Sequence, residues 1–272
     1  MGHAATDPER FEQIKQPVAA LHRWNSTLMV VLSFGVLLVA WHIGATLWPS
    51  RSFPAPLNVL QTFISETASG DLPYHLAITL WRVAASFFLA MTIGSVIGVL
   101  LGNHSRADQF FNPWLILFLN VPALVIIVLA YIWFGLNEAA AIGAVAVNKI
   151  PNVVVTIREG TRALDPRYAE MAKVYRLGAL DRLRHIMLPQ LQPYIAAASR
   201  SGVALIWKIV LVVELLGRSN GVGFQINLFF QLFDVAAILA YTLAFVAVML
   251  FIELVVVQPL EHTSTRWRRR AA

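Results

Sequence analysis

The chain has 272 residues, of which 58% are hydrophobic and only 13% are charged. A soluble globular protein carries about 25% charged residues, so this composition excludes a soluble fold and indicates a protein embedded in a membrane. The formal net charge is +6, but the basic residues lie between apolar blocks and near the C-terminus. That distribution favours membrane topology signals over nucleic-acid binding. The chain has no cysteine, which excludes disulfide bonds, thiolate metal sites and cysteine nucleophiles.

We predict an all-α integral membrane fold with about six transmembrane helices. Each apolar segment has roughly the 20 residues that a helix needs to cross about 30 Å of hydrocarbon. The segments run approximately over residues 27–48, 82–101, 114–134, 138–157, 194–216 and 235–257. The predicted transmembrane domain therefore covers residues 27–257. A polar segment, residues 1–26, precedes it, and a basic tail, residues 258–272, follows it.

The distribution of lysine and arginine predicts the orientation. Basic residues gather in segment 1–26, in the loop at residues 158–192 and in the tail 258–272, whereas the loops on the opposite side hold Arg51 and Arg218. Because basic loops are retained in the cytoplasm, we predict that both termini are cytoplasmic. The arginine-rich tail also suits contact with anionic membrane lipid, but we favour the simpler interpretation that it is only a stop-transfer anchor.

The region before the second span is expected to hold a short helix. Pro54, Pro56, Gly70 and Pro73 interrupt residues 53–80, and apolar residues recur at helical spacing between them. We predict a short amphipathic helix at the outer membrane interface.

A glycine stripe in the second span predicts close helix packing. Gly94, Gly98 and Gly102 are four residues apart, so they lie on one helix face and let a second backbone approach. The helix that approaches belongs either to the same chain or to a second subunit.

Polar residues within the predicted spans are candidates for the lining of a path through the membrane. Charged groups are costly in hydrocarbon and so usually face a protein interior or a water-filled cavity. Lys149 and Lys208 favour an anionic solute, or they pair between helices or extend toward the membrane surface. Glu214 lies four residues before Arg218, a spacing that suits an ion pair. The candidate path residues are Asn148, Lys149, Trp207, Lys208 and Glu214.

Prolines within two of the predicted spans are expected to relax or kink their helices. One site is Asn120-Val121-Pro122 in the third span, and the other runs from Asn148 to Asn152 in the fourth.

The loop at residues 158–192 is predicted to be helical and not a passive linker. Asp165 is a suitable N-cap, and Pro166 suits the first turn of a short helix that follows. Gly178 is expected to interrupt the helical structure, and a second helix is expected to start near Asp181 and to stop at Pro189.

This loop resembles the motif of binding-protein-dependent ABC importer permeases. Their motif begins Glu-Ala-Ala, has a glycine six residues after the glutamate, and ends in Leu-Pro eighteen and nineteen residues after it. Here Glu170-Met171-Ala172 begins the motif and Leu188-Pro189 ends it at the matching spacing. Arg176 stands at the glycine position, and a glycine follows two residues later as Gly178.

The resemblance extends over approximately residues 50–260 and is to the nitrate/sulfonate/taurine-type permeases. It is carried by the Pro54-Ala-Pro sequence, by Arg82 at the start of the second span, and by Glu214-Leu-Leu-Gly followed by Gly221-Val-Gly. A literal Glu138-Ala139-Ala140 sequence lacks the downstream Leu-Pro and opens a predicted span on the outer side, so we do not assign the motif to it.

The resemblance implies a type I ABC importer permease in a bacterial plasma membrane. In that family two permease chains pair, here expected as a homodimer, and associate with two copies of an ATP-binding subunit and with a substrate-binding protein. The loop would dock on the ATPase, with Glu170 orienting the loop or pairing with a basic group there. The other possibility is that Glu170 pairs within its own loop, with Arg167 or Lys173. The implied solute is small and anionic. The coupling residues would be Glu170, Met171, Ala172, Arg176, Gly178, Leu188 and Pro189.

The sequence itself contains no Gly-rich loop ending in Lys-Ser or Lys-Thr that would bind phosphates. We therefore expect no cofactor on this chain and expect ATP to be used by a partner subunit. The histidines are scattered without metal-pair spacing, and no serine lies in a nucleophile-elbow sequence, so neither a metal site nor catalysis is expected. The alternative is a secondary carrier driven by an ion gradient.

Overall fold

The computed structural model describes residues 8–50 and 52–259. Residues 1–7, most of the basic tail predicted at 258–272, and Arg51 lie outside the described residues. The chain divides into two units, Met1–Gln61 and Thr62–Ala272, and each is considered by itself.

The first unit consists of helix α1 (Pro8–Leu47), a short connection and the start of α2 (Pro56–Ser69). The connection folds back on the end of α1, since the indole Nε1 of Trp41 donates a 3.0 Å hydrogen bond to the carbonyl oxygen of Pro54. α2 is the short helix predicted between the first two spans; its place at a membrane interface stays a prediction.

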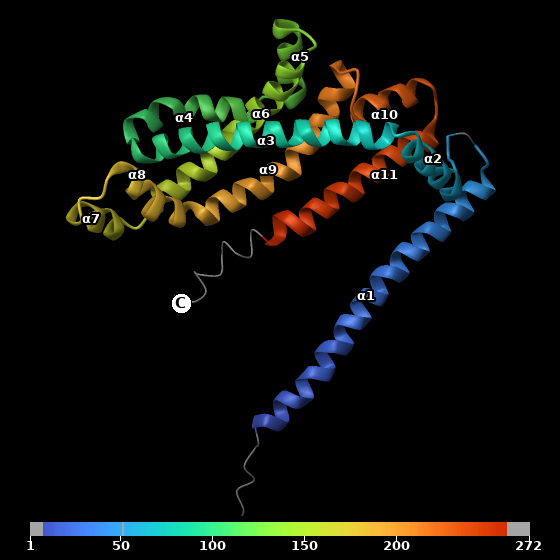
Figure 1. Ribbon diagram of the computed structural model, residues 1–272, viewed down its shortest axis with the longest axis horizontal. Helices are drawn as coiled ribbons and strands as arrows, with labels where there is room; N and C mark the ends of the chain where they lie inside the picture. Colours follow the sequence, from blue (N-terminus) through green and yellow to red (C-terminus); the bar gives the residue numbers. More distant parts are fainter. Residues whose placement is uncertain (1–7, 51, 260–272) are drawn as a thin grey trace, which may run out of the picture. The chain divides into compact units, whose positions relative to one another are not determined.

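The second unit is built from the remaining helices (Figure 1). Within the described part of the chain no β-strand is present, as an all-α membrane fold requires. In chain order the elements are α3 (Asp71–Asn103), α4 (Ser105–Asn120), α5 (Ala123–Phe134), α6 (Glu138–Arg162), α7 (Pro166–Val174), α8 (Ala179–Arg182), the π-helical turn η1 (Leu183–Met187), α9 (Leu188–Gly217), α10 (Val222–Gln231), α11 (Val235–Ile252) and the π-helical turn η2 (Glu253–Val257).

The described residues contain five helical runs that are long and apolar enough to cross a membrane, or six if α4 and α5 together make one span. The predicted number of about six spans is confirmed. The limits differ for the second span, because α3 begins at Asp71, well before the predicted start at Arg82. The five runs are Leu28–Leu47, Asp71–Asn103, Glu138–Arg162, Ala179–Gly217 and Val235–Val255.

The third predicted span, residues 114–134, is not one continuous helix. α4 and α5 meet at an angle of 96°. Pro122 has no amide hydrogen and disfavours helical backbone at Val121, which is extended at φ −72° and ψ 124°. The Asn120 side-chain amide donates to the carbonyl oxygen of Ile116 at 2.7 Å, within the last turn of α4. The distortion expected at Asn120-Val121-Pro122 is therefore present and is larger than a kink, because the chain breaks into two helices. At the second expected site α6 continues through Pro151 as one helix.

The glycine stripe of α3 packs against α6 of the same chain. A Cβ atom added to Gly94 would lie 2.6 Å from the Cβ of Val153, and one added to Gly98 would lie 2.8 Å from the Cβ of Ile157. One added to Gly102 would lie 2.5 Å from the Cβ of Thr161. The absence of side chains at the three glycines thus allows close contact between two long helices.

Candidate functional site

The loop that follows α6 contains a short capped helix, as predicted. Asp165 is the N-cap of α7, and its Oδ1 accepts a 2.9 Å hydrogen bond from the backbone N–H of Arg167, while Pro166 occupies the first turn. The helix ends at Val174, and the amide of Leu177 donates to the carbonyl oxygen of Ala172 at 2.9 Å. α7 is therefore a folded element with defined ends.

Arg176 takes the backbone conformation that a glycine usually takes after a helix. Its φ is +50°, in the left-handed region, whereas Gly178 has an ordinary φ of −63°. The left-handed residue is thus at the position where the family motif has glycine. A non-glycine residue in this region carries a steric cost of about 1–2 kcal/mol. This chain therefore differs from the motif in the residue at that position, but it keeps the left-handed backbone turn there.

The second helix of the loop does not stop at Pro189, so that prediction is wrong. α8, η1 and α9 form one helical run from Ala179 to Gly217, with Pro189 in the first turn of α9. The π-helical turn shifts the hydrogen-bond register just before the proline, with the amide of Leu188 donating to the carbonyl oxygen of Leu183. The helix therefore accommodates a residue that has no amide hydrogen.

Gln190 joins the two ends of the loop. Its Oε1 accepts a 3.0 Å hydrogen bond from the backbone N–H of Asp165, and its Nε2 donates to the carbonyl oxygen of Ile186 at 3.1 Å. The entry to α7 is thereby fixed to the first turn of α9.

The loop presents apolar side chains that no other part of the described chain covers. Val174, Tyr175 and Leu180 are 79%, 72% and 76% exposed, and Met171 and Leu188 are also exposed. Ala172, in contrast, is buried. Glu170 is exposed and forms no ion pair among residues 8–50 and 52–259, so the pairing with Arg167 or Lys173 is not seen. Such a surface suits contact with another protein.

At the opposite end of the helical body a buried charge cluster joins α3, α6, α9 and α10. Arg82 of α3 is 1% exposed, and its Nη1 donates to Glu214 Oε1 at 2.7 Å and to the carbonyl oxygen of Asn220 at 2.8 Å. Its Nε donates to Glu138 Oε1 at 3.0 Å. Glu214 also accepts hydrogen bonds from the hydroxyl of Thr79 and, at 2.9 Å, from the amide of Gly223.

Glu214 does not pair with Arg218 through their side chains, contrary to the spacing argument. Arg218 Nε instead lies 3.1 Å from Glu138 Oε2, and Glu214 is 0% exposed. The carboxylate of Glu214 is thus sealed in the cluster. The sequence contained no local signal for this arrangement, because Arg82 and Glu138 come from distant segments.

Lys149 and Lys208 have different surroundings. Lys149 of α6 is 2% exposed, and its Nζ donates a 3.3 Å hydrogen bond to the hydroxyl of Ser201 on α9. Lys208 is exposed, with its Nζ 5.4 Å from the ring centre of Trp207. Neither lysine forms an ion pair among the residues that the structure describes. Asn148 is half-buried beside Lys149.

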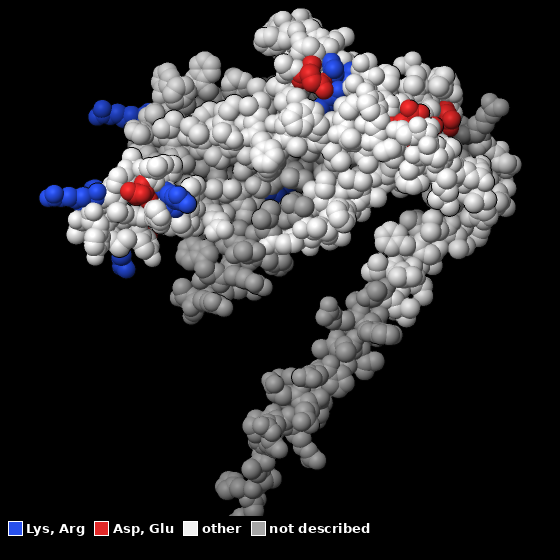
Figure 2. All heavy atoms as spheres, viewed as in Figure 1, with Lys and Arg blue, Asp and Glu red and all other residues white. Residues whose placement is uncertain are grey.

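Charged side chains on the visible face gather toward the two ends of the helical body (Figure 2). Between them the visible surface is almost entirely uncharged. An uncharged band between charged ends is typical of a membrane-spanning body.

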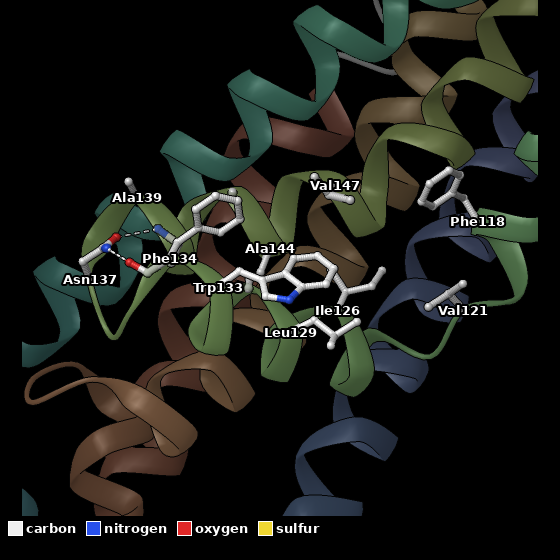
Figure 3. A pocket seen from close by; sticks show the side chains of 13 residues that line it. Phe118, Val121, Ile126, Leu129, Trp133, Phe134, Asn137, Ala139, Ala144 and Val147 are labelled. Atoms are coloured by element: carbon white, nitrogen blue, oxygen red, sulfur yellow. Dashed lines mark hydrogen bonds between the residues drawn. The ribbon is translucent and has the colours of Figure 1, made fainter.

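An apolar cavity of about 630 Å³ lies between α4, α5 and α6. Trp133, Ile126 and Leu129 of α5 and Ala144 and Val147 of α6 line it (Figure 3). At one end Asn137 caps α6, accepting a hydrogen bond of 2.8 Å from the amide of Ala140. The residues predicted for the path do not line this cavity.

The comparisons with known proteins agree with these features. The family model described as "Binding-protein-dependent transport system inner membrane component" matches residues 90–269. The chain is 28% identical over 214 residues to the putative aliphatic sulfonates transport permease protein SsuC of Bacillus subtilis, covering 78% of this chain and 76% of the relative. It is 25% identical over 255 residues to the taurine transport system permease protein TauC of Escherichia coli, covering 90% and 92%.

Among solved structures, the MetNI methionine ABC transporter in an inward-facing conformation matches with a TM-score of 0.59 at 15% identity. That match covers 76% of this chain and 99% of the other. An amino acid ABC transporter matches with a TM-score of 0.52 at 19% identity, covering 76% and 98%. Identities this low support the fold alone.

The chain belongs to the family of inner-membrane components of binding-protein-dependent transport systems, the permeases of ABC importers. Within that family its relatives are permeases of the nitrate, sulfonate and taurine type, as the sequence resemblance predicted. It is accordingly a multi-pass protein of the bacterial inner membrane.

Proposed function

We propose that this chain forms the membrane path of an ATP-driven importer for a small anionic solute that a substrate-binding protein delivers. The observation that carries the proposal is the folded loop α7–α8. It exposes Val174, Tyr175 and Leu180 and continues without a break into the long helix α9. An element of this kind can receive a displacement from a partner and pass it into the membrane.

The partner at the loop is a separate ATP-binding subunit, because this chain has no phosphate-binding loop of its own. The ATP-binding subunit is proposed to contact Met171, Leu188 and the exposed carboxylate of Glu170. The shape of the loop is set by Ala172, Arg176, Gly178 and Pro189. We expect two ATP-binding subunits and two copies of this chain, with both termini and the loop in the cytoplasm. The chain itself carries no catalytic residue in this scheme.

The solute is proposed to be anionic on two grounds. The names of the relatives specify aliphatic sulfonates, taurine, nitrate and bicarbonate, which each bear an anionic group. In addition, Lys149 places an amino group in the interior between α6 and α9 with no carboxylate beside it among the described residues. Asn148, Trp207 and Lys208 are the other candidates for the path, whereas Glu214 holds together the buried charge cluster around Arg82.

The test is transport by the purified complex in proteoliposomes. The tagged chain is purified from its host with whatever subunits accompany it, and native mass spectrometry gives the composition. We expect two copies of this chain with two copies of an ATP-binding chain. Uptake of a labelled alkanesulfonate or nitrate should require the binding protein. It should also require ATP on the side of the membrane where the ATPase lies. Uptake that follows an imposed ion gradient without ATP would instead identify a secondary carrier.

A further inference from the structure

A second cluster of charged residues, distinct from the one around Arg82, joins α4 to the end of α6 from which the loop departs. Asp108 lies in the first turn of α4 and is buried. Its Oδ1 accepts a 2.9 Å hydrogen bond from Arg158 Nη1, and its Oδ2 accepts one from Arg162 Nη2. One carboxylate on α4 is thus held by two guanidinium groups that lie one helical turn apart on α6.

The link between Asp108 and Arg158 is protected from solvent. Both side chains are 10% exposed, and Arg158 Nη1 also donates to Asn112 Oδ1 on α4 at 2.8 Å. An ion pair removed from water and supported by further hydrogen bonds resists separation, because each charge would be left buried without its partner. Arg162 and Glu159, at 42% and 51%, are much more exposed and form the outer part of the cluster.

The position of this cluster relates the loop to the α4–α5 break. Arg162 is the last residue of α6, and the loop helix α7 begins at Pro166. Figure 1 shows the turn between α3 and α4 at the same end of the body as α7 and α8. From Asp108, α4 runs to Asn120, where the chain turns by 96° into α5. A movement of the loop end of α6 therefore reaches α4 at one end, and the interruption at Val121-Pro122 lies at the other.

We propose that Asp108 is the positioning residue that makes α4 follow the loop end of α6, so that the break at Val121-Pro122 acts as a hinge between α4 and α5. The inference rests on the proposed function, since it concerns how the ATPase cycle is conveyed to the path. Asp108 touches neither solute nor nucleotide in this scheme. Its effect is on the amount of solute moved for each ATP hydrolysed.

The experiment measures uptake and ATP hydrolysis together in proteoliposomes that contain the full complex. Asp108→Asn is expected to lower the uptake per ATP at least fivefold while the ATPase rate stays within twofold of the unmodified complex. Asp108→Glu, which keeps the charge, is expected to restore most of the ratio. Glu159→Gln is the matched control, because it removes an acid from the same cluster that lies on α6 itself and does not connect to α4.

Arg162→Gln keeps the test decisive if Asp108→Asn fails to assemble, because this side chain is partly exposed and its loss is compatible with folding. It removes one of the two links, so an intermediate fall in uptake per ATP is expected. An unchanged ratio in the variants that assemble, or uptake and hydrolysis that fall together, would overturn the inference. An unmodified complex without ATP-dependent uptake would overturn the proposed function itself, which separates the two failures.

Discussion

Arg82 of α3 and Glu214 of α9 lie 132 residues apart in the sequence, yet their side chains share a 2.7 Å hydrogen bond in the interior. Thr79, Gly223, Asn220 and Glu138 complete the surroundings of the pair. The carboxylate of Glu214 therefore fixes the turn between α9 and α10 to α3.

Glu214→Gln should destabilise the protein by about 3 kcal/mol, because loss of one partner leaves the Arg82 guanidinium buried with less compensating charge. Thermal unfolding in detergent measures the loss. Glu253→Gln is the control, since Glu253 lies 3.7 Å from Arg200 in a more exposed pair, for which we expect less than about 1 kcal/mol. Equal effects of the two substitutions would contradict the importance of the buried cluster.

Arg176→Gly should stabilise the loop by about 1 kcal/mol, because glycine adopts a φ of +50° without the clash that a Cβ causes. Hydrogen exchange at the Leu177 amide, which donates to the carbonyl oxygen of Ala172, should slow about fivefold. Arg176→Ala removes the same charge and keeps the Cβ, so it should give no such slowing. A similar slowing in both variants would show that the side chain, and not the backbone, sets the stability.

Gly98→Ala should destabilise the α3–α6 contact. The added methyl group would lie 2.9 Å from the carbonyl oxygen of Val154, so the helices must separate, at a cost of about 1–3 kcal/mol. Gly35→Ala adds the same group where no atom lies within 4 Å, and it should be neutral or slightly stabilising. The comparison is made by thermal unfolding, and a neutral Gly98→Ala would mean that the two helices are not closely packed.

Lys149→Gln should reduce uptake of an anionic solute about tenfold without loss of the assembled complex. A favourable interaction of roughly 1.4 kcal/mol with the anion corresponds to that factor. Ser201→Ala is the companion variant, because it removes the hydrogen-bond partner of Lys149 and leaves the charge of the lysine in place. Normal uptake kinetics in Lys149→Gln would eliminate the lysine as a determinant of the solute.

Val174→Asp should prevent the ATP-binding subunit from copurifying, while the chain alone remains folded in detergent. Val174 is 79% exposed on α7, so a charge there costs little in the free chain and much in an apolar contact. Val174→Thr, of similar shape, is expected to retain most of the association. Copurification of the ATPase with the aspartate variant would place the docking surface elsewhere.

Local patterns predicted the helical class, the number of spans and the cap at Asp165, because each depends on a short stretch of sequence. The same patterns indicated a distortion at Pro122 but neither the complete break nor its angle, which depends on what α4 and α5 pack against. Pro189 was misassigned as a helix end, since the compensating π-helical turn has no recognisable sequence signal. The clusters around Arg82 and Asp108 were not predicted, because their partners come from separate helices.

The continuous run from Ala179 to Gly217 has 39 residues. At 1.5 Å per residue it is about 58 Å long, nearly twice the roughly 30 Å thickness of the hydrocarbon core. With Glu214 anchored near one end, a large part of the run must extend past the hydrocarbon at the other. The start of the run, which contains α8, therefore lies in the aqueous phase, at a distance from the hydrocarbon that the number of helical turns determines.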